Sequence, residues 1–138
     1  MPSSPLNSAQ IQELLTQAKN VAIVGVSDKA DRPSYGVAQY LLNNSHFKIF
    51  LVNPSIDSVL GEKVYDSLSE IEEHIDLVDV FRKPADCISV LEEAITIGAD
   101  AIWLQLGISS DAVASRGHDA GLKVVMDRCL KVDYANLV

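Results

Sequence analysis

The stretch VAIVGVSDKADRPSYG occupies residues 21–36 and combines an apolar run, a polar loop and the beginning of a helix. Residues 21–24 are all apolar and Gly25 follows them, a pattern typical of a short strand buried in a parallel sheet. Residues 26–33 are mostly polar and form neither a strand nor a helix pattern. Beyond this loop, apolar residues recur at helical spacing: Val37, Ala38, Leu41 and Leu42. The order strand, long loop and helix predicts the first crossover of an α/β sheet.

The loop of this crossover has the composition of an anion-binding site. In an open α/β sheet the first crossover often binds phosphate, because loop N–H groups and the following helix N-terminus carry partial positive charge. Lys29 and Arg32 add full positive charge there. Ser34 can cap the helix, and Gly25 allows a ligand to approach the backbone closely. Neither common nucleotide motif, G-x-G-x-x-G or G-x-x-x-x-G-K-[ST], is present, so an ordinary solvated loop remains the alternative.

Length and charge limit the possible classes of protein. The chain has 138 residues, 48% of them hydrophobic, which suffices for one well-buried core and is too few for two full domains. We therefore expect one domain over residues 1–138, with residues 1–6 as a loose leader. The formal net charge of −8 argues against a general nucleic-acid or anionic-membrane surface. No apolar run could span a bilayer or serve as a signal peptide, so we expect a cytoplasmic protein.

The two cysteines give no sign of a disulfide framework or a structural zinc site. Cys87 and Cys129 lie far apart, with no C-x-x-C or Cys/His cluster between them. Cys87 falls midway along a predicted helix, where it is expected to pack against the sheet. We expect both cysteines to be free thiols.

Short apolar strands and helical segments alternate along the rest of the chain. Residues 55–61 are expected to be irregular and residues 63–65 to be a brief extended piece. The four further strands of the main sheet are expected at residues 47–52, 77–81, 101–106 and 122–126. Alternation with short connections predicts parallel strands and right-handed crossovers. The expected fold class is therefore α/β, a Rossmann-like three-layer domain with a five-stranded, mainly parallel sheet.

The helix boundaries carry recognisable signals. Asn7 and Gln10 form a weak capping pair for a first helix. Pro84 stands where the first turn of a helix tolerates proline, and Gly98 is the expected end of that helix. A further helix is expected to begin after Ser109 or Ser110.

Ligands of such a sheet bind beyond the carboxyl ends of the strands, near the point where strand order reverses. An NAD-binding domain usually has an acidic residue after its second strand to hold the ribose hydroxyls, whereas this chain has Asn53, which makes NAD a less favoured ligand. Each residue at a strand end could also be an ordinary turn, core or solvated residue. The residues expected at this edge are Gly25, Val26, Ser27, Asn53, Pro54, Phe81, Arg82, Lys83, Gln105, Gly107, Asp127, Arg128 and Cys129.

With these residues assembled, the sequence resembles the small stand-alone CoA-binding proteins related to the N-terminal domain of the succinate–CoA ligase α subunit. The likeness covers nearly the whole chain and consists of six blocks in the same order. The blocks are Val24-Gly25-Val26-Ser27 with Arg32-Pro33-Ser34-Tyr35, Leu51-Val52-Asn53-Pro54, Gly61 with Tyr65 and Ser67-Leu68, Val78-Asp79-Val80-Phe81-Arg82, Trp103-Leu104-Gln105-Leu106-Gly107, and Asp127-Arg128-Cys129.

The resemblance implies that coenzyme A lies across the strand ends. The first loop, with Lys29, Ser34 and Tyr35 among its residues, would lie near the phosphates. Asn53-Pro54 and Phe81-Arg82 would follow the nucleotide and linker, and the Gln105 and Cys129 region would lie towards the thiol. The segment around His118 is similar to the phosphohistidine loop of the ligases, but that loop belongs to a second domain, so we interpret His118 as a surface or helix-end residue.

The predicted function is therefore CoA or acyl-CoA binding without a complete catalytic site. No Ser/His/Asp set, carboxylate pair or metal cluster can be assembled from the strand-end residues, so no catalytic or metal-binding residue is assigned. One alternative is an NAD(P)-binding oxidoreductase-like domain, which lacks support from a glycine motif. Another is a partner-binding subunit with a vestigial nucleotide pocket.

Overall fold

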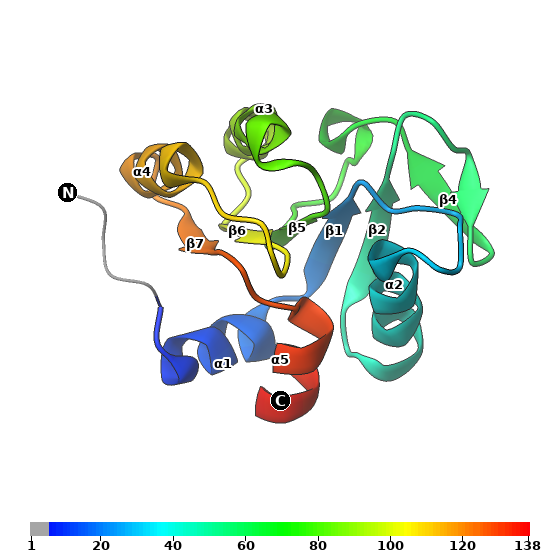
Figure 1. The fold of residues 1–138 in the computed structure, drawn as a ribbon, viewed down its shortest axis with the longest axis horizontal. Helices are drawn as coiled ribbons and strands as arrows, with labels where there is room; N and C mark the ends of the chain where they lie inside the picture. The colour runs from blue at the N-terminus through cyan, green and yellow to red at the C-terminus, as the bar shows by residue number, and fades with distance from the viewer. Residues whose placement is uncertain (1–5) are drawn as a thin grey trace.

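The computed structural model describes residues 6–138, and they form a three-layer α/β structure with one central sheet (Figure 1). The strands lie in the order β3-β4-β2-β1-β5-β6-β7, and every pairing is parallel except that of β3 with β4. The elements in chain order are α1 (Ser8–Gln17), β1 (Asn20–Val24), α2 (Pro33–Asn44), β2 (Lys48–Val52), β3 (Ser58–Val59), β4 (Glu62–Tyr65), the 3₁₀ turn η1 (Leu68–Glu70), β5 (Leu77–Val80), α3 (Pro84–Thr96), β6 (Ala101–Leu104), α4 (Asp111–Asp119), β7 (Lys123–Val125) and α5 (Leu130–Leu137).

The α/β Rossmann-like class is confirmed, but the predicted strand number is wrong, because the sheet has seven strands rather than five. The two additional strands form a small hairpin at the edge of the sheet. β3 and β4 are joined by Leu60 and Gly61, which both have positive φ, the backbone conformation that a type I′ hairpin turn requires. A strand of two residues is too short for periodicity to detect. The extended piece expected at residues 63–65 is part of β4.

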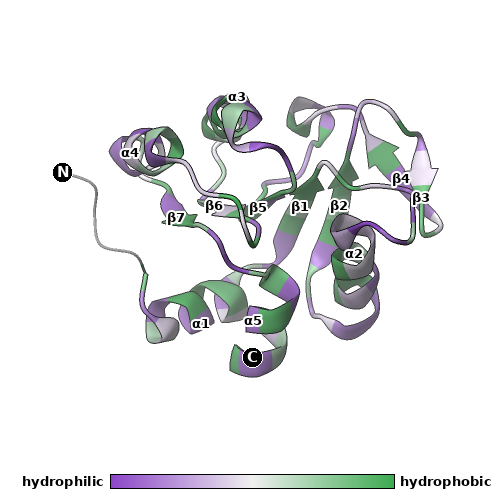
Figure 2. Cartoon of the chain, viewed as in Figure 1, coloured by the Kyte–Doolittle hydropathy of each residue, from purple (hydrophilic) through white to green (hydrophobic). Residues whose placement is uncertain are grey.

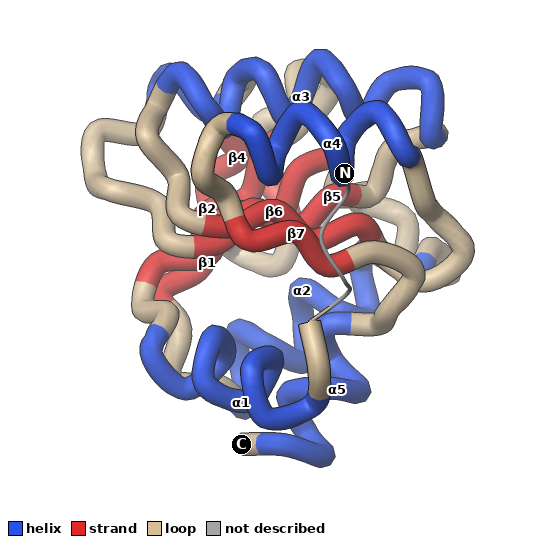
Figure 3. The backbone as a smooth tube through the Cα atoms, turned by 90° about the vertical axis from the view of Figure 1, so that its left-hand side faces the viewer, coloured by secondary structure: helices blue, strands red, loops and turns tan. Residues whose placement is uncertain are grey.

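Helices cover both faces of the sheet (Figure 3), with α3 and α4 on one face and α1, α2 and α5 on the other. The strands are therefore buried on both sides, and successive residues alternate between two apolar clusters. Val21 and Ile23 of β1 belong to the cluster beneath α1, α2 and α5, whereas Ala22 and Val24 belong to the cluster beneath α3 and α4. Figure 2 shows that the central strands are largely hydrophobic, whereas the helices carry both hydrophobic and hydrophilic residues.

Local signals explain most of the helix boundaries. Asn7 and Gln10 form the reciprocal capping box expected for α1, with bonds of 2.8 and 2.9 Å. The Ser110 hydroxyl accepts the Val113 N–H at the start of α4. Cys87 is fully buried in α3 as expected, and burial raises the pKa of its thiol. The capping predictions for α1 and α4 are thus confirmed.

The C-terminal helix α5 was not predicted. The helix has no cap bond from the side chain of its N-cap residue, Cys129, so the sequence lacks the usual start signal. Its position is fixed instead by contacts that are distant in the sequence. The Tyr134 hydroxyl accepts the backbone N–H of His46 at 3.1 Å, and the Leu137 carbonyl accepts a hydrogen bond from the Gln12 side chain at 2.8 Å.

Two expectations from the sequence concern the chain ends and the membrane. The loose leader expected at residues 1–6 falls outside the described residues except for Leu6, which is half-buried against the core. Within residues 6–138, no helix combines the length and the hydropathy needed to cross a bilayer.

Candidate functional site

A cavity of about 530 Å³ opens over the carboxyl ends of β1, β5 and β6. These strands are neighbours, and β1 is the point at which strand order reverses, because β2 lies on its other side. The cavity is lined by Gly25, Ser27, Lys29, Arg32, Pro33, Ser34, Phe81, Arg82, Lys83, Gln105, Leu106 and Ile108. Nine of the fifteen residues that the sequence assigns to ligand binding are among these twelve.

Gly25 ends β1 at the floor of the cavity. Its φ of +87° is a conformation that only glycine adopts readily, and its N–H donates to the Val52 carbonyl at 2.9 Å. A Cβ at this position would lie 2.3 Å from the Phe81 carbonyl oxygen. The ends of β1 and β5 therefore approach each other too closely for any side chain, and a ligand could come near the backbone here.

The loop between β1 and α2 is folded by its own hydrogen bonds. The Ser34 hydroxyl accepts the Ser27 N–H at 2.9 Å, and the Ser27 hydroxyl accepts the Lys29 N–H at 3.0 Å. The prediction that Ser34 caps α2 is wrong, since Arg32 holds the N-cap position and makes no side-chain cap bond. Ser34 instead holds the loop over the first turn of the helix.

Positive charge is concentrated at the cavity. Lys29, Arg32, Arg82 and Lys83 line it, and no acidic side chain does. The starts of α2 and α3 also lie there, because Arg32 and Lys83 are their N-cap residues, and neither start is capped by a side chain. In a chain with a formal net charge of −8, this is a local basic site with the features that bind anions.

The cavity lining has few groups for chemistry. None of its residues is histidine, cysteine, aspartate or glutamate. Ser27 and Ser34 therefore have no base beside them in the lining, and their hydroxyls already accept backbone hydrogen bonds. The arrangement is suited to holding an anionic ligand by charge and backbone contacts.

Residues 19–135 match the family model described as the CoA binding domain, which is most of the chain. The chain belongs to the CoA-binding domain family. It is 37% identical over 129 residues to the YneT protein of Bacillus subtilis, covering 94% of this chain and 95% of YneT. A hypothetical protein from Pyrococcus horikoshii has the same fold, with a TM-score of 0.92 and 34% identity over 99% of this chain and 98% of its own.

The CoA-binding domain is also related to part of larger ligases. The acetate–CoA ligase (ADP-forming) of Methanocaldococcus jannaschii is 32% identical over 79 residues, which are 57% of this chain and 11% of the ligase. The similarity to the ligase therefore concerns a small part of that enzyme. His118, which resembles the ligases' phosphohistidine in sequence context, is an exposed residue in the last turn of α4, as predicted, and does not line the cavity.

Six residues that the sequence assigns to ligand binding in this CoA-binding domain lie outside the cavity over β1, β5 and β6. Val26 is fully buried, and Tyr35 packs against the core. Asn53 faces the protein, since its amide donates to the Val26 carbonyl at 2.7 Å and its oxygen accepts the Ser55 N–H at 2.8 Å. Pro54 lines a neighbouring groove that also contains Arg82.

Gly107 and Cys129 are the last two of these six residues. Gly107 donates its N–H to the Asp127 carboxylate at 2.7 Å. Cys129 lines a second cavity of about 430 Å³, which shares Pro33, Gln105 and Leu106 with the first. The two cavities are therefore adjacent and share these three residues as a common wall.

Sequence reasoning missed Pro33, Leu106 and Ile108 as lining residues. Leu106 was predicted to continue the fourth strand, but β6 ends at Leu104 and the Leu106 side chain is 66% exposed. No polar motif marks these positions. An apolar residue after a strand is indistinguishable in sequence from the end of the strand itself.

Proposed function

We propose that this chain binds coenzyme A or an acyl-CoA across the carboxyl edge of its sheet and has no complete catalytic site of its own. The observation that carries the proposal is the cavity with four cationic side chains, no acidic ones and two uncapped helix starts, in a member of the CoA-binding domain family. Coenzyme A carries a diphosphate and a 3′-phosphate, so it is a ligand with enough negative charge to use all four cations.

The shape of the site suggests how the ligand would lie. The phosphates would lie between Lys29 and Arg32 on one side and Arg82 and Lys83 on the other. The thiol end would extend past Gln105 towards the second cavity, where Cys129 lies. That second cavity is lined mainly by apolar groups, which suits a pantetheine arm better than a phosphate.

Titration calorimetry with CoA, dephospho-CoA and NAD tests the proposed function. We expect CoA to bind most tightly and NAD most weakly, because the cavity offers cations for a 3′-phosphate that dephospho-CoA and NAD lack. Equal affinity for CoA and dephospho-CoA would contradict a role for the 3′-phosphate. Preference for NAD would favour an oxidoreductase-like domain, and binding of none would favour a vestigial pocket.

Reversing the charge of Arg32 is expected to weaken CoA binding without unfolding the chain. Loss of one charge-assisted contact to phosphate costs about 1.5–3 kcal/mol, so Arg32→Glu should raise the Kd for CoA roughly 10- to 150-fold. Arg32 is exposed, so thermal stability should change little. The matched control is Lys123→Glu at the start of β7, which lies outside the cavity. Equal loss of affinity in both variants would indicate long-range charge alone.

A further inference from the structure

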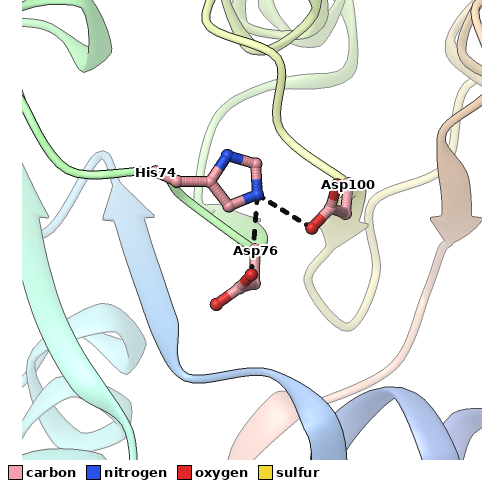
Figure 4. A group of neighbouring side chains, drawn as sticks. All are labelled: His74, Asp76 and Asp100. Atoms are coloured by element: carbon pink, nitrogen blue, oxygen red, sulfur yellow. Dashed lines mark hydrogen bonds and ion pairs between the residues drawn. The ribbon is translucent and has the colours of Figure 1, made fainter.

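Three side chains that could bind a metal ion meet at the amino edge of the sheet, opposite the proposed CoA site (Figure 4). His74 lies in the loop before β5, Asp76 immediately precedes β5, and Asp100 immediately precedes β6. The His74 Nε2 atom lies 2.9 Å from Asp100 Oδ2 and 3.6 Å from Asp76 Oδ1. One ligand atom from each residue lies within 4.8 Å of the other two.

Backbone hydrogen bonds hold this group in place. The second oxygen of Asp76, Oδ2, accepts the N–H groups of Lys19 and Asn20 at 2.9 and 2.8 Å. Oδ1 is therefore the oxygen turned towards His74. The Asn20 side-chain amide donates to the His74 carbonyl at 2.8 Å, and the Asp100 carbonyl accepts the Lys123 N–H at 3.1 Å. Such outer contacts orient ligands before a metal binds.

The imidazole does not satisfy both carboxylates by itself. Its Nε2 can donate one hydrogen bond, which goes to Asp100, and the 3.6 Å separation from Asp76 is too long for a second. Among residues 6–138, Asp76 and Asp100 form ion pairs with His74 and with no lysine or arginine. Two carboxylates thus share at most one positive charge, and an additional cation would be favoured between them.

The spacing fits a small divalent ion. Two ligand atoms of tetrahedral Zn²⁺, with bonds of about 2.0–2.2 Å, lie roughly 3.3–3.6 Å apart. The separations of 2.9 and 3.6 Å around His74 Nε2 need only small side-chain shifts to reach this range. An imidazole nitrogen suits Zn²⁺ and neighbouring transition metals and does not suit Ca²⁺ or Mg²⁺, which take oxygen ligands.

We propose that His74, Asp76 and Asp100 form a binding site for a divalent transition metal ion of the Zn²⁺ type, with water completing its coordination. The imidazole is what distinguishes this group from a cluster of acidic residues, because it supplies a ligand nitrogen and so selects for the metal. The bound ion would connect the loop before β5 with the loop before β6 and, through Asp76, with the start of β1.

Titration of the tag-free protein with ZnCl₂ tests the proposal, with calorimetry as the readout. We expect one site whose Kd rises at least tenfold in His74→Ala and in Asp100→Asn. Both side chains are more than half exposed, so these variants should fold, and circular dichroism checks that they do. Asp76 is not changed, because its hydrogen bonds to the Lys19 and Asn20 N–H groups give it a structural role.

The controls separate a metal site from general attraction of cations. His118→Ala removes another exposed histidine, outside the group, and should leave the Zn²⁺ affinity unchanged. CaCl₂ should bind at least tenfold more weakly than ZnCl₂. The proposal is overturned if Zn²⁺ binds only at millimolar concentration, if Ca²⁺ binds as tightly, or if both site variants keep the affinity of the unchanged protein.

Discussion

Replacing Gly25 with alanine is expected to lower the free energy of unfolding by about 2–5 kcal/mol. Two costs combine at this position. A φ of +87° is strained for alanine, and the new Cβ would lie 2.3 Å from the Phe81 carbonyl oxygen. The obstacle is a backbone atom of Phe81, which directly follows β5, so no side-chain rotation can relieve the contact. Urea denaturation followed by circular dichroism measures the loss.

Other glycines provide matched controls for this prediction. Gly98→Ala has the strain of positive φ, at +75°, but its Cβ would meet open space, so it should cost about 1 kcal/mol. Gly36→Ala lies within α2 in open space and should stabilise the fold by about 0.5–1 kcal/mol. If Gly25→Ala lowered the free energy of unfolding no more than Gly98→Ala, the ends of β1 and β5 could separate without cost. Glycine would then be needed at position 25 for its φ alone.

The core strands could be predicted from sequence because their signal is local. An apolar run ended by Gly25 is sufficient to locate β1. The alternation of strands and helices predicts that the main strands run parallel to one another. The β3–β4 hairpin was missed because β3 has only two residues and β4 only four, on either side of a turn at Leu60. Strands this short show no clear periodicity. The helix α5 was missed because distant partners hold it in place: the backbone N–H of His46 donates to Tyr134.

The candidate site was predicted best where residues follow strands directly. The cations of the first loop and Arg82-Lys83 are in the lining because parallel strands end at one edge. Asn53 was placed at the right edge, but its side chain turns inward to the Val26 carbonyl, an orientation that no pattern encodes. The metal-binding group could not be predicted, since Asp100 comes from another loop and joins the other two ligands only in the folded chain.

Replacing Asp79 with valine is expected to stabilise the protein at neutral pH by about 1–3 kcal/mol. Asp79 lies in β5 between Ile23 of β1 and Trp103 of β6, and it is completely buried. Neither of its carboxylate oxygens has a hydrogen-bond partner among the described residues. Valine would fill this apolar environment without an unpaired polar group, so denaturation at pH 7 should show the gain.

The same carboxyl group should make stability depend on pH. Desolvation raises the pKa of Asp79 well above its ordinary value in the folded protein. The unfolded chain releases the proton above about pH 4, whereas the folded chain keeps it, so the contribution of Asp79 to stability falls as pH rises from about 4 towards its folded pKa. The advantage of Asp79→Val over the unchanged protein should therefore be smallest near pH 4, where only the cost of the unpaired neutral group remains, and grow at higher pH.

Asp79→Asn separates the cost of burying an unpaired polar group from the effect of titration, because asparagine has nearly the same shape as aspartate and does not titrate. It should remove the pH-dependent loss while keeping an unpaired polar group in the core, so its stability should lie between those of the unchanged protein and Asp79→Val at pH 7. Other ionisable groups titrate equally in all three proteins and cancel when the unfolding free energies are subtracted. Differences that stay constant from pH 4 to pH 8 would mean that Asp79 keeps an ordinary pKa, and hence that a polar partner reaches it in solution.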